Sequence, residues 1–123
     1  MNELQKLMDE VGSWSDDAFG SGQRSLAILH HLAKEIPELL NAIGDYDRGA
    51  NDTRVNVSEM MELHRKMRFE FADVFMLLLD AARKRGFMAE DLIQVTKLKL
   101  EVNRRRKCGK PDENGVIEHL RES

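Results

Sequence analysis

Residues 69–79 form the most apolar segment of the chain, and they carry two acids: Phe69-Glu70-Phe71-Ala72-Asp73-Val74-Phe75-Met76-Leu77-Leu78-Leu79. A second run has the same character: His30-His31-Leu32-Ala33-Lys34-Glu35-Ile36-Pro37-Glu38-Leu39-Leu40. Within each run the two acids are spaced i and i+3, which places both on one face of a helix. Each pair is therefore expected to point toward a seam where helices pack.

Four carboxylates gathered in such a seam need a cation between them. Like charges repel, and a carboxylate taken out of water is costly unless it is paired. Mg²⁺ prefers oxygen ligands and commonly works with substrate phosphates, so these acids suit it, and Mn²⁺ or another divalent cation can substitute. Acids at this spacing are also frequent on solvated helix faces, where they pair with Lys or Arg one turn away. The residues alone leave both interpretations open.

Composition and charge limit the class of protein. The chain has 123 residues, a net charge of -3, two prolines and one cysteine. The length suits a single domain, assigned to residues 1–123. The acidic balance speaks against general nucleic-acid binding, because that needs a basic face.

The chain shows no sign of a membrane segment. No apolar run approaches the ~20 residues of a membrane span, and the first residues do not resemble a signal peptide. We therefore expect no membrane association. A lone cysteine is typical of a reducing compartment, so we expect a cytoplasmic location.

Apolar periodicity and turn residues predict helices over about residues 2–11, 23–43, 58–86 and 89–107. Between them we expect a glycine-containing loop at 12–22 and a polar loop at 44–57. The tail, residues 108–123, contains two glycines and a proline and is expected to be irregular. The fold class predicted is all-α, a compact antiparallel helix bundle with the acids lining its core.

Three blocks follow one another along the chain: His31-Leu32-Ala33-Lys34-Glu35-Ile36-Pro37-Glu38-Leu39, then Glu70-Phe71-Ala72-Asp73 leading to Leu79-Asp80-Ala81-Ala82-Arg83-Lys84-Arg85-Gly86, then Lys99-Leu100-Glu101-Val102-Asn103-Arg104-Arg105-Arg106. They resemble the MazG-like all-α nucleotide pyrophosphohydrolases. Residues 14–20 and 114–122 further resemble the branch of dATP/dGTP diphosphohydrolases that is common in phages. The resemblance covers nearly the whole chain apart from residues 44–57.

The resemblance implies a Mg²⁺-dependent enzyme that hydrolyses a deoxynucleoside triphosphate to the monophosphate and pyrophosphate. The implied metal ligands are Glu35, Glu38, Glu70 and Asp73, and Glu38 is also the candidate catalytic residue that positions or deprotonates the attacking water. The branch implies dGTP and dATP as substrates, nucleotide-pool control as the role, and the host cytoplasm as the location if a phage encodes the chain. A homodimer or homotetramer is expected, because the last helix, the tail and residues 44–57 are candidates for completing a neighbour's pocket.

Six further residues are candidates for holding the substrate: Trp14, Lys34, Asp80, Lys99, Asn103 and Arg106. The last three lie at i, i+4 and i+7 on one helix stripe that can face a triphosphate, although basic residues there also complement the helix dipole. Trp14 offers a flat surface for a base or caps the core. Asp80 binds a ribose hydroxyl or base amine, or it pairs with Arg83 or Lys84, which is the commoner arrangement.

Two alternatives stay open at this point. The same chemistry could act on dUTP, dCTP or a damaged nucleotide. The chain could instead be a non-catalytic helical interaction module, in which the acids form a solvated rim and a methionine-rich segment contacts a partner helix. Divalent cations should raise the melting temperature of the enzyme and leave that of the module unchanged.

Overall fold

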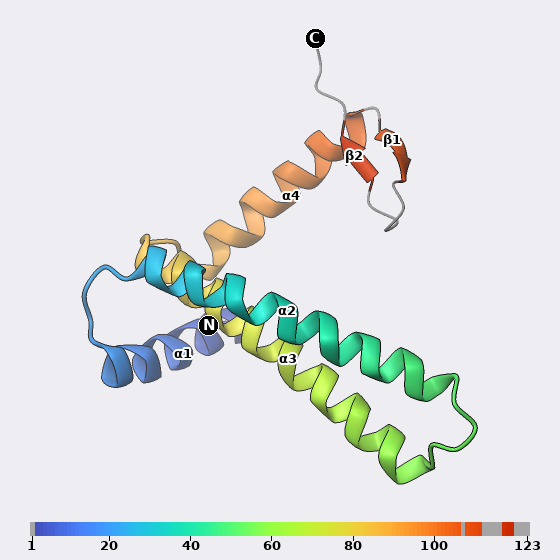
Figure 1. Cartoon of the computed structure of the whole chain (residues 1–123). Helices are drawn as coiled ribbons and strands as arrows, with labels where there is room; N and C mark the ends of the chain where they lie inside the picture. Colours follow the sequence, from blue (N-terminus) through green and yellow to red (C-terminus); the bar gives the residue numbers. More distant parts are fainter. Residues whose placement is uncertain (1, 107, 112–116, 120–123) are drawn as a thin grey trace. The chain divides into compact units, whose positions relative to one another are not determined.

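The computed structural model describes residues 2–106, 108–111 and 117–119. Within these residues the helices are α1 (Glu3–Phe19), α2 (Ser25–Ala50), α3 (Val57–Lys84) and α4 (Ala89–Arg105) (Figure 1). Two short strands, β1 (Cys108–Pro111) and β2 (Ile117–His119), pair antiparallel. The prediction of an all-α fold is confirmed, since the helices make up nearly all of the regular structure.

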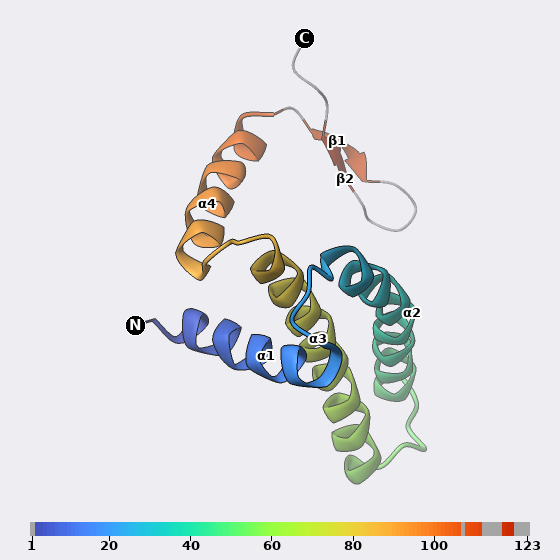
Figure 2. The same cartoon turned by 90° about the vertical axis from the view of Figure 1, so that its left-hand side faces the viewer.

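The chain forms two compact units, Met1–Phe87 and Met88–Ser123. In the first unit, α2 and α3 pack side by side as an antiparallel hairpin, and α1 lies against α3 (Figure 2). The second unit contains α4 and the strand pair. The assignment of residues 1–123 to one domain stays a prediction.

The core of the first unit is small and draws on all three helices. Its buried apolar residues are Met8, Val11, Ile28, Ala42, Leu79 and Ala81. Met8 is the largest fully buried side chain of this group. Because two of these residues are alanines, the helices can approach closely, and this brings the side chains of the α2–α3 seam within reach of one another.

Two asparagines determine where the helices begin. The Asn2 side chain accepts a hydrogen bond of 2.7 Å from the backbone N–H of Gln5 at the start of α1. At the start of α3, Asn56 accepts one of 2.8 Å from the backbone N–H of Glu59. Each cap satisfies an N–H that has no partner within its helix. The third helix therefore begins at residue 57, one residue before its predicted start.

Two predicted loops are wrong, and glycine is the reason in both. Most of residues 12–22 continue α1 as far as Phe19, and the first half of the predicted loop 44–57 continues α2 as far as Ala50. Gly12 and Gly49 are buried inside these helices. A methyl group on Gly49 would lie 2.7 Å from Leu63 Cδ1, so glycine serves close packing of two helices here rather than a turn.

The predicted irregular tail is also wrong in part. Residues 108–111 and 117–119 are strands, and they pair Cys108 with His119 and Pro111 with Ile117. Strand pairing joins two separate segments, and such a pairing is not indicated by local glycine and proline content. Among the described helices, none has the length and apolar character required to cross a membrane.

Candidate active site

Three of the four predicted acids meet between α2 and α3. Glu35 comes from α2, while Glu70 and Asp73 come from one face of α3, and each places a carboxylate oxygen within 4.8 Å of the others. All three are half-buried. The spacing of three residues brings the two α3 acids together, and the packing of α2 along α3 adds Glu35 from the opposite side.

Glu70 is the acid most affected by this arrangement. Its pKa is raised above the usual range, first by removal from water and then by the charges of Asp73, Glu35 and Glu38. Its Oε2 atom is buried and has no hydrogen-bond partner among the residues that the structure describes. Among the described residues, no Lys or Arg forms an ion pair with Glu70 or Asp73. A buried, unpaired oxygen within a group of like charges fits a site that holds a divalent cation.

Glu38, the fourth predicted acid, is exposed and lies outside this group. Its charge still acts on Glu70. Metal binding by Glu38 therefore stays a prediction, and so does its role toward the attacking water.

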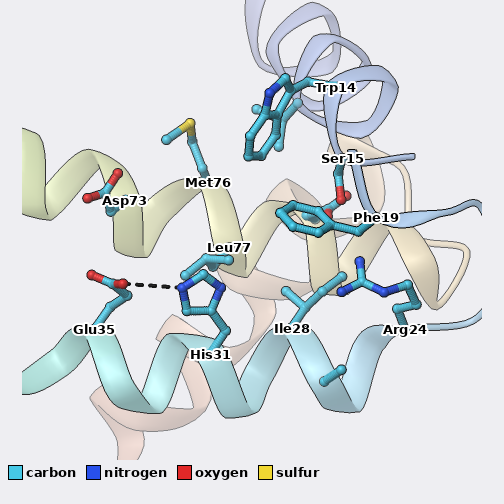
Figure 3. Close-up of a pocket in the computed structure, with 13 residues that line it drawn as sticks. Trp14, Ser15, Phe19, Arg24, Ile28, His31, Glu35, Asp73, Met76 and Leu77 are labelled. Atoms are coloured by element: carbon cyan, nitrogen blue, oxygen red, sulfur yellow. Dashed lines mark hydrogen bonds and ion pairs between the residues drawn. The ribbon is translucent and has the colours of Figure 1, made fainter. Parts of the chain in front are cut away.

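His31 contributes to the site, although it is not among the site residues predicted from the sequence. Its Nε2 lies 3.2 Å from Glu35 Oε1, one helical turn away (Figure 3). This contact orients the Glu35 carboxylate beside the acids of α3. The signal that could have found it is the i, i+4 spacing of the two residues.

A cavity of about 200 Å³ opens beside the acids, lined by residues of α1, α2 and α3 and by Arg24 at the start of α2. Figure 3 shows Glu35 and Asp73 at one end of it and Phe19 at the other. Trp14 covers a further side, and its ring meets that of Phe19 edge to face, with centroids 5.6 Å apart. Trp14 is 60% exposed, so it does not cap the core. Its ring is instead available to a ligand in the cavity.

Asp80 also lines the cavity, and the predicted pairing with Arg83 is confirmed. Asp80 is buried, and its Oδ1 accepts a hydrogen bond of 2.9 Å from Arg83 Nε. Arg83 Nη2 donates in turn to Asp16 on α1 at 2.9 Å, and Lys84 donates to the same Asp16 oxygen at 2.7 Å. Because of these hydrogen bonds, the pKa of Asp16 falls to about 2. The ion pairs hold the end of α1 that carries Phe19 against α3.

The other predicted substrate ligands are not among the residues that line this cavity. Lys34 is exposed on α2 and does not line the cavity. Lys99 and Asn103 lie on α4, and Arg106 caps its C-terminal end, in the second unit. The Oδ1 atom of Asn103 is buried, and no described residue forms a hydrogen bond with it. The roles of these four residues toward substrate stay predictions.

Residues 56–123 match the family model of the dATP/dGTP pyrophosphohydrolases. The chain belongs to this family. The match is shorter than the resemblance described above, but it includes α3 with Glu70 and Asp73. No curated protein and no solved structure is significantly similar to the chain.

Family membership confirms the prediction of an enzyme. The protein is a nucleoside triphosphate pyrophosphohydrolase, and the non-catalytic alternative is set aside. The family and the acid cluster together agree with a hydrolase that depends on a divalent metal ion. Glu35 and Glu38 lie outside the matched segment, so only the tertiary structure links Glu35 to the two α3 acids that lie inside it.

Proposed function

We propose that this protein is a Mg²⁺-dependent diphosphohydrolase that converts dGTP and dATP to their monophosphates and pyrophosphate. One observation carries the proposal: three acids with oxygens within 4.8 Å of one another adjoin a cavity with aromatic walls. The acids supply a place for a cation and a triphosphate, and the cavity supplies a place for a base. The family match supports purine deoxynucleotides as the substrates.

The donor set supports the choice of metal. The three ligand oxygens are all carboxylate oxygens, contributed by Glu35, Glu70 and Asp73. Such a set favours Mg²⁺, and Mn²⁺ or another divalent cation would bind the same oxygens. When bound, the ion would neutralise charge on the phosphate oxygens and lower the pKa of a nearby water.

The chain's own residues divide the remaining work. Glu38 is exposed one turn after Glu35, and it takes part in none of the ion pairs among the described residues. It is therefore free to accept a proton from the water that attacks the α-phosphorus. His31 holds Glu35 in place, and Trp14 offers its exposed ring to the base.

The variant Glu38→Gln tests the catalytic assignment. It keeps the size of the side chain and removes the base, so turnover should fall about 10²-fold or more. The melting temperature should not fall below that of the wild type, because Glu38 is exposed and its charge only adds to the repulsion on Glu70. Glu10→Gln, an exposed acid on α1, is the matched control and should retain full activity. Near wild-type turnover of the Glu38 variant at saturating Mg²⁺ would show that the base is misassigned.

Phosphorus NMR of the reaction mixture tests the reaction type. The expected products are a nucleoside monophosphate and pyrophosphate, from dGTP and dATP in preference to dUTP, dCTP or damaged nucleotides. Inorganic phosphate as the first product would contradict attack at the α-phosphorus.

We also propose that the protein forms a homodimer or homotetramer and acts in control of the purine deoxynucleotide pool. The proposed location is the cytoplasm, which is the host cytoplasm if a phage encodes the chain. Large apolar side chains are exposed on α2 and α3: Leu26, Leu29, Leu40, Phe69, Phe71, Phe75 and Leu78. A second copy of the chain could bury such a surface. Sedimentation equilibrium at assay concentration tests this, and a monomer would contradict it.

A further inference from the structure

We infer that Arg24 makes this site select guanine over adenine. The inference rests on the proposed function, because it concerns the base of the same substrate. It begins from the end of the cavity opposite the acids. Figure 3 shows Glu35 and Asp73 on one side and Arg24 with Phe19 on the other, with the rings of Trp14 and Phe19 near the Arg24 end.

Arg24 is held by an aromatic ring rather than by a carboxylate. Its guanidinium carbon lies 5.0 Å from the centroid of the Phe19 ring. Its Nη1 atom is buried and has no hydrogen-bond partner, and Arg24 forms no ion pair among the described residues. A contact with a ring face fixes the position of the guanidinium but satisfies none of its N–H donors. Because Arg24 also lines the cavity, the cavity wall carries a positioned guanidinium that has no acceptor among the described residues.

The acceptor expected there belongs to the base and not to a phosphate. The acids, which lie at the other end of the cavity, would hold the cation that attracts the triphosphate. Around Arg24 the walls are aromatic and apolar, with Phe19, Trp14 and Ile28. Flat apolar walls suit the faces of a base, while the edge of the base meets the guanidinium.

Hydrogen-bonding chemistry then separates the two purines. Guanine presents O6 and N7, two neighbouring acceptors that an arginine can bind with two N–H groups. Adenine presents N7 beside its N6 amine, which is a donor, so one arginine N–H would face another donor. Arg24 is thus satisfied by guanine and only partly satisfied by adenine.

Asp80 adds a complementary group to the same cavity. It is 4% exposed, and its Oδ1 is bonded to Arg83, while no donor is paired with its Oδ2 among the residues that the structure describes. A carboxylate accepts hydrogen bonds and donates none. Guanine has a 2-amino donor that adenine lacks, so an acceptor in this wall favours the same base.

The test is the ratio of kcat/KM for dGTP to that for dATP. In Arg24→Met, which keeps the length and loses the donors, kcat/KM for dGTP should fall about ten-fold to a hundred-fold, because that is the discrimination supplied by a bidentate arginine contact. For dATP the change should stay within about two-fold, because the bond lost at N7 is offset by removal of the unfavourable approach of an arginine N–H to the N6 amine. Arg65→Met is the matched control: Arg65 also lies over a ring, 5.3 Å from the centroid of Phe69, but it does not line the cavity. Neither nucleotide should be affected by it.

A second measurement uses the wild type and so does not depend on the folding of a variant. The analogue 7-deaza-dGTP lacks N7, and its kcat/KM should lie about ten-fold below that of dGTP. Equal kcat/KM values for dGTP and dATP, equal losses for both in Arg24→Met, or full activity on 7-deaza-dGTP would each overturn the inference and leave the proposed function intact. If neither dGTP nor dATP is hydrolysed, the proposed function itself is wrong.

Discussion

Replacing Glu70 by Gln should stabilise the metal-free protein and weaken its response to Mg²⁺. Glu70 stands among acids whose ligand oxygens lie within 4.8 Å, and its own Oε2 has no hydrogen-bond partner. In the absence of a cation its charge opposes folding. In the presence of one, the same charge is a ligand.

The size of the effect follows from Coulomb's law. At 4.8 Å, two unit charges repel by about 1 kcal/mol in water and by about 3.5 kcal/mol at an effective dielectric constant near 20. Since the acids are half-buried and open to solvent, the lower figure applies. Glu70 has two such neighbours, so the free energy of unfolding should rise by about 2 kcal/mol, which raises Tm by roughly 6 to 8 °C.

The pH dependence gives a second signature. The pKa of Glu70 in the folded state is raised above its ordinary value of 4.5. Protonation of Glu70 therefore stabilises the folded protein. This stabilisation is fully present below pH 4.5 and is lost as the pH rises through the raised pKa. The Tm difference between Glu70→Gln and the wild type should be largest at neutral pH and should close as the pH falls toward 4.5.

The assay is thermal unfolding of the wild type, Glu70→Gln and the control Glu10→Gln, in EDTA and in Mg²⁺. At about 1,000 times its Kd, Mg²⁺ should stabilise the wild type by about 4.1 kcal/mol and the Glu70 variant by much less, so the order of the two Tm values should reverse. The control should follow the wild type in both buffers. A Glu70 variant that melts below the wild type in EDTA would refute the account of repulsion within the cluster.

Three further results are expected. Trp14→Ala should raise KM for dGTP and dATP about ten-fold with little change in kcat, because base stacking on an aromatic ring is lost; an unchanged KM in steady-state kinetics would mean that the base is held elsewhere. Gly12→Ala adds a methyl group that would collide with the Arg83 side chain, and it should lower the free energy of unfolding by about 1 to 3 kcal/mol. Gly22→Ala is the control: the added methyl group would have no other atom within 4 Å, so the Tm should not change. Equal melting temperatures of the two variants would contradict the packing argument. Because the pKa of Asp16 is lowered from 3.8 to about 2, its ion pairs should stabilise the fold above pH 3.8, and this stabilisation should be lost as the pH falls toward 2. Asp16→Asn should remove this part of the pH profile of Tm. An unchanged profile in the variant would count against a stabilising role of the ion pairs.

Local periodicity was sufficient to predict the helices and the acids on their faces. A helix repeats every 3.6 residues, so the spacing of Glu70 and Asp73 places them together whatever surrounds the helix. Local sequence does not predict the structure at Gly12 and Gly49, because glycine indicates a loop there while the helices continue through both residues. A glycine that permits a turn and a glycine that permits close packing of two helices look the same in the sequence.

Tertiary structure alone decided which residues meet. Glu35 joins Glu70 and Asp73, while Glu38, one turn further on, remains outside, because the alignment of α2 along α3 selects one of two acids with the same local pattern. The cavity likewise combines residues from α1, α2 and α3, and the contact of Arg24 with the Phe19 ring joins the start of α2 to the end of α1. Helical spacing acts over a few residues, whereas these contacts depend on how far and in which register the helices approach one another.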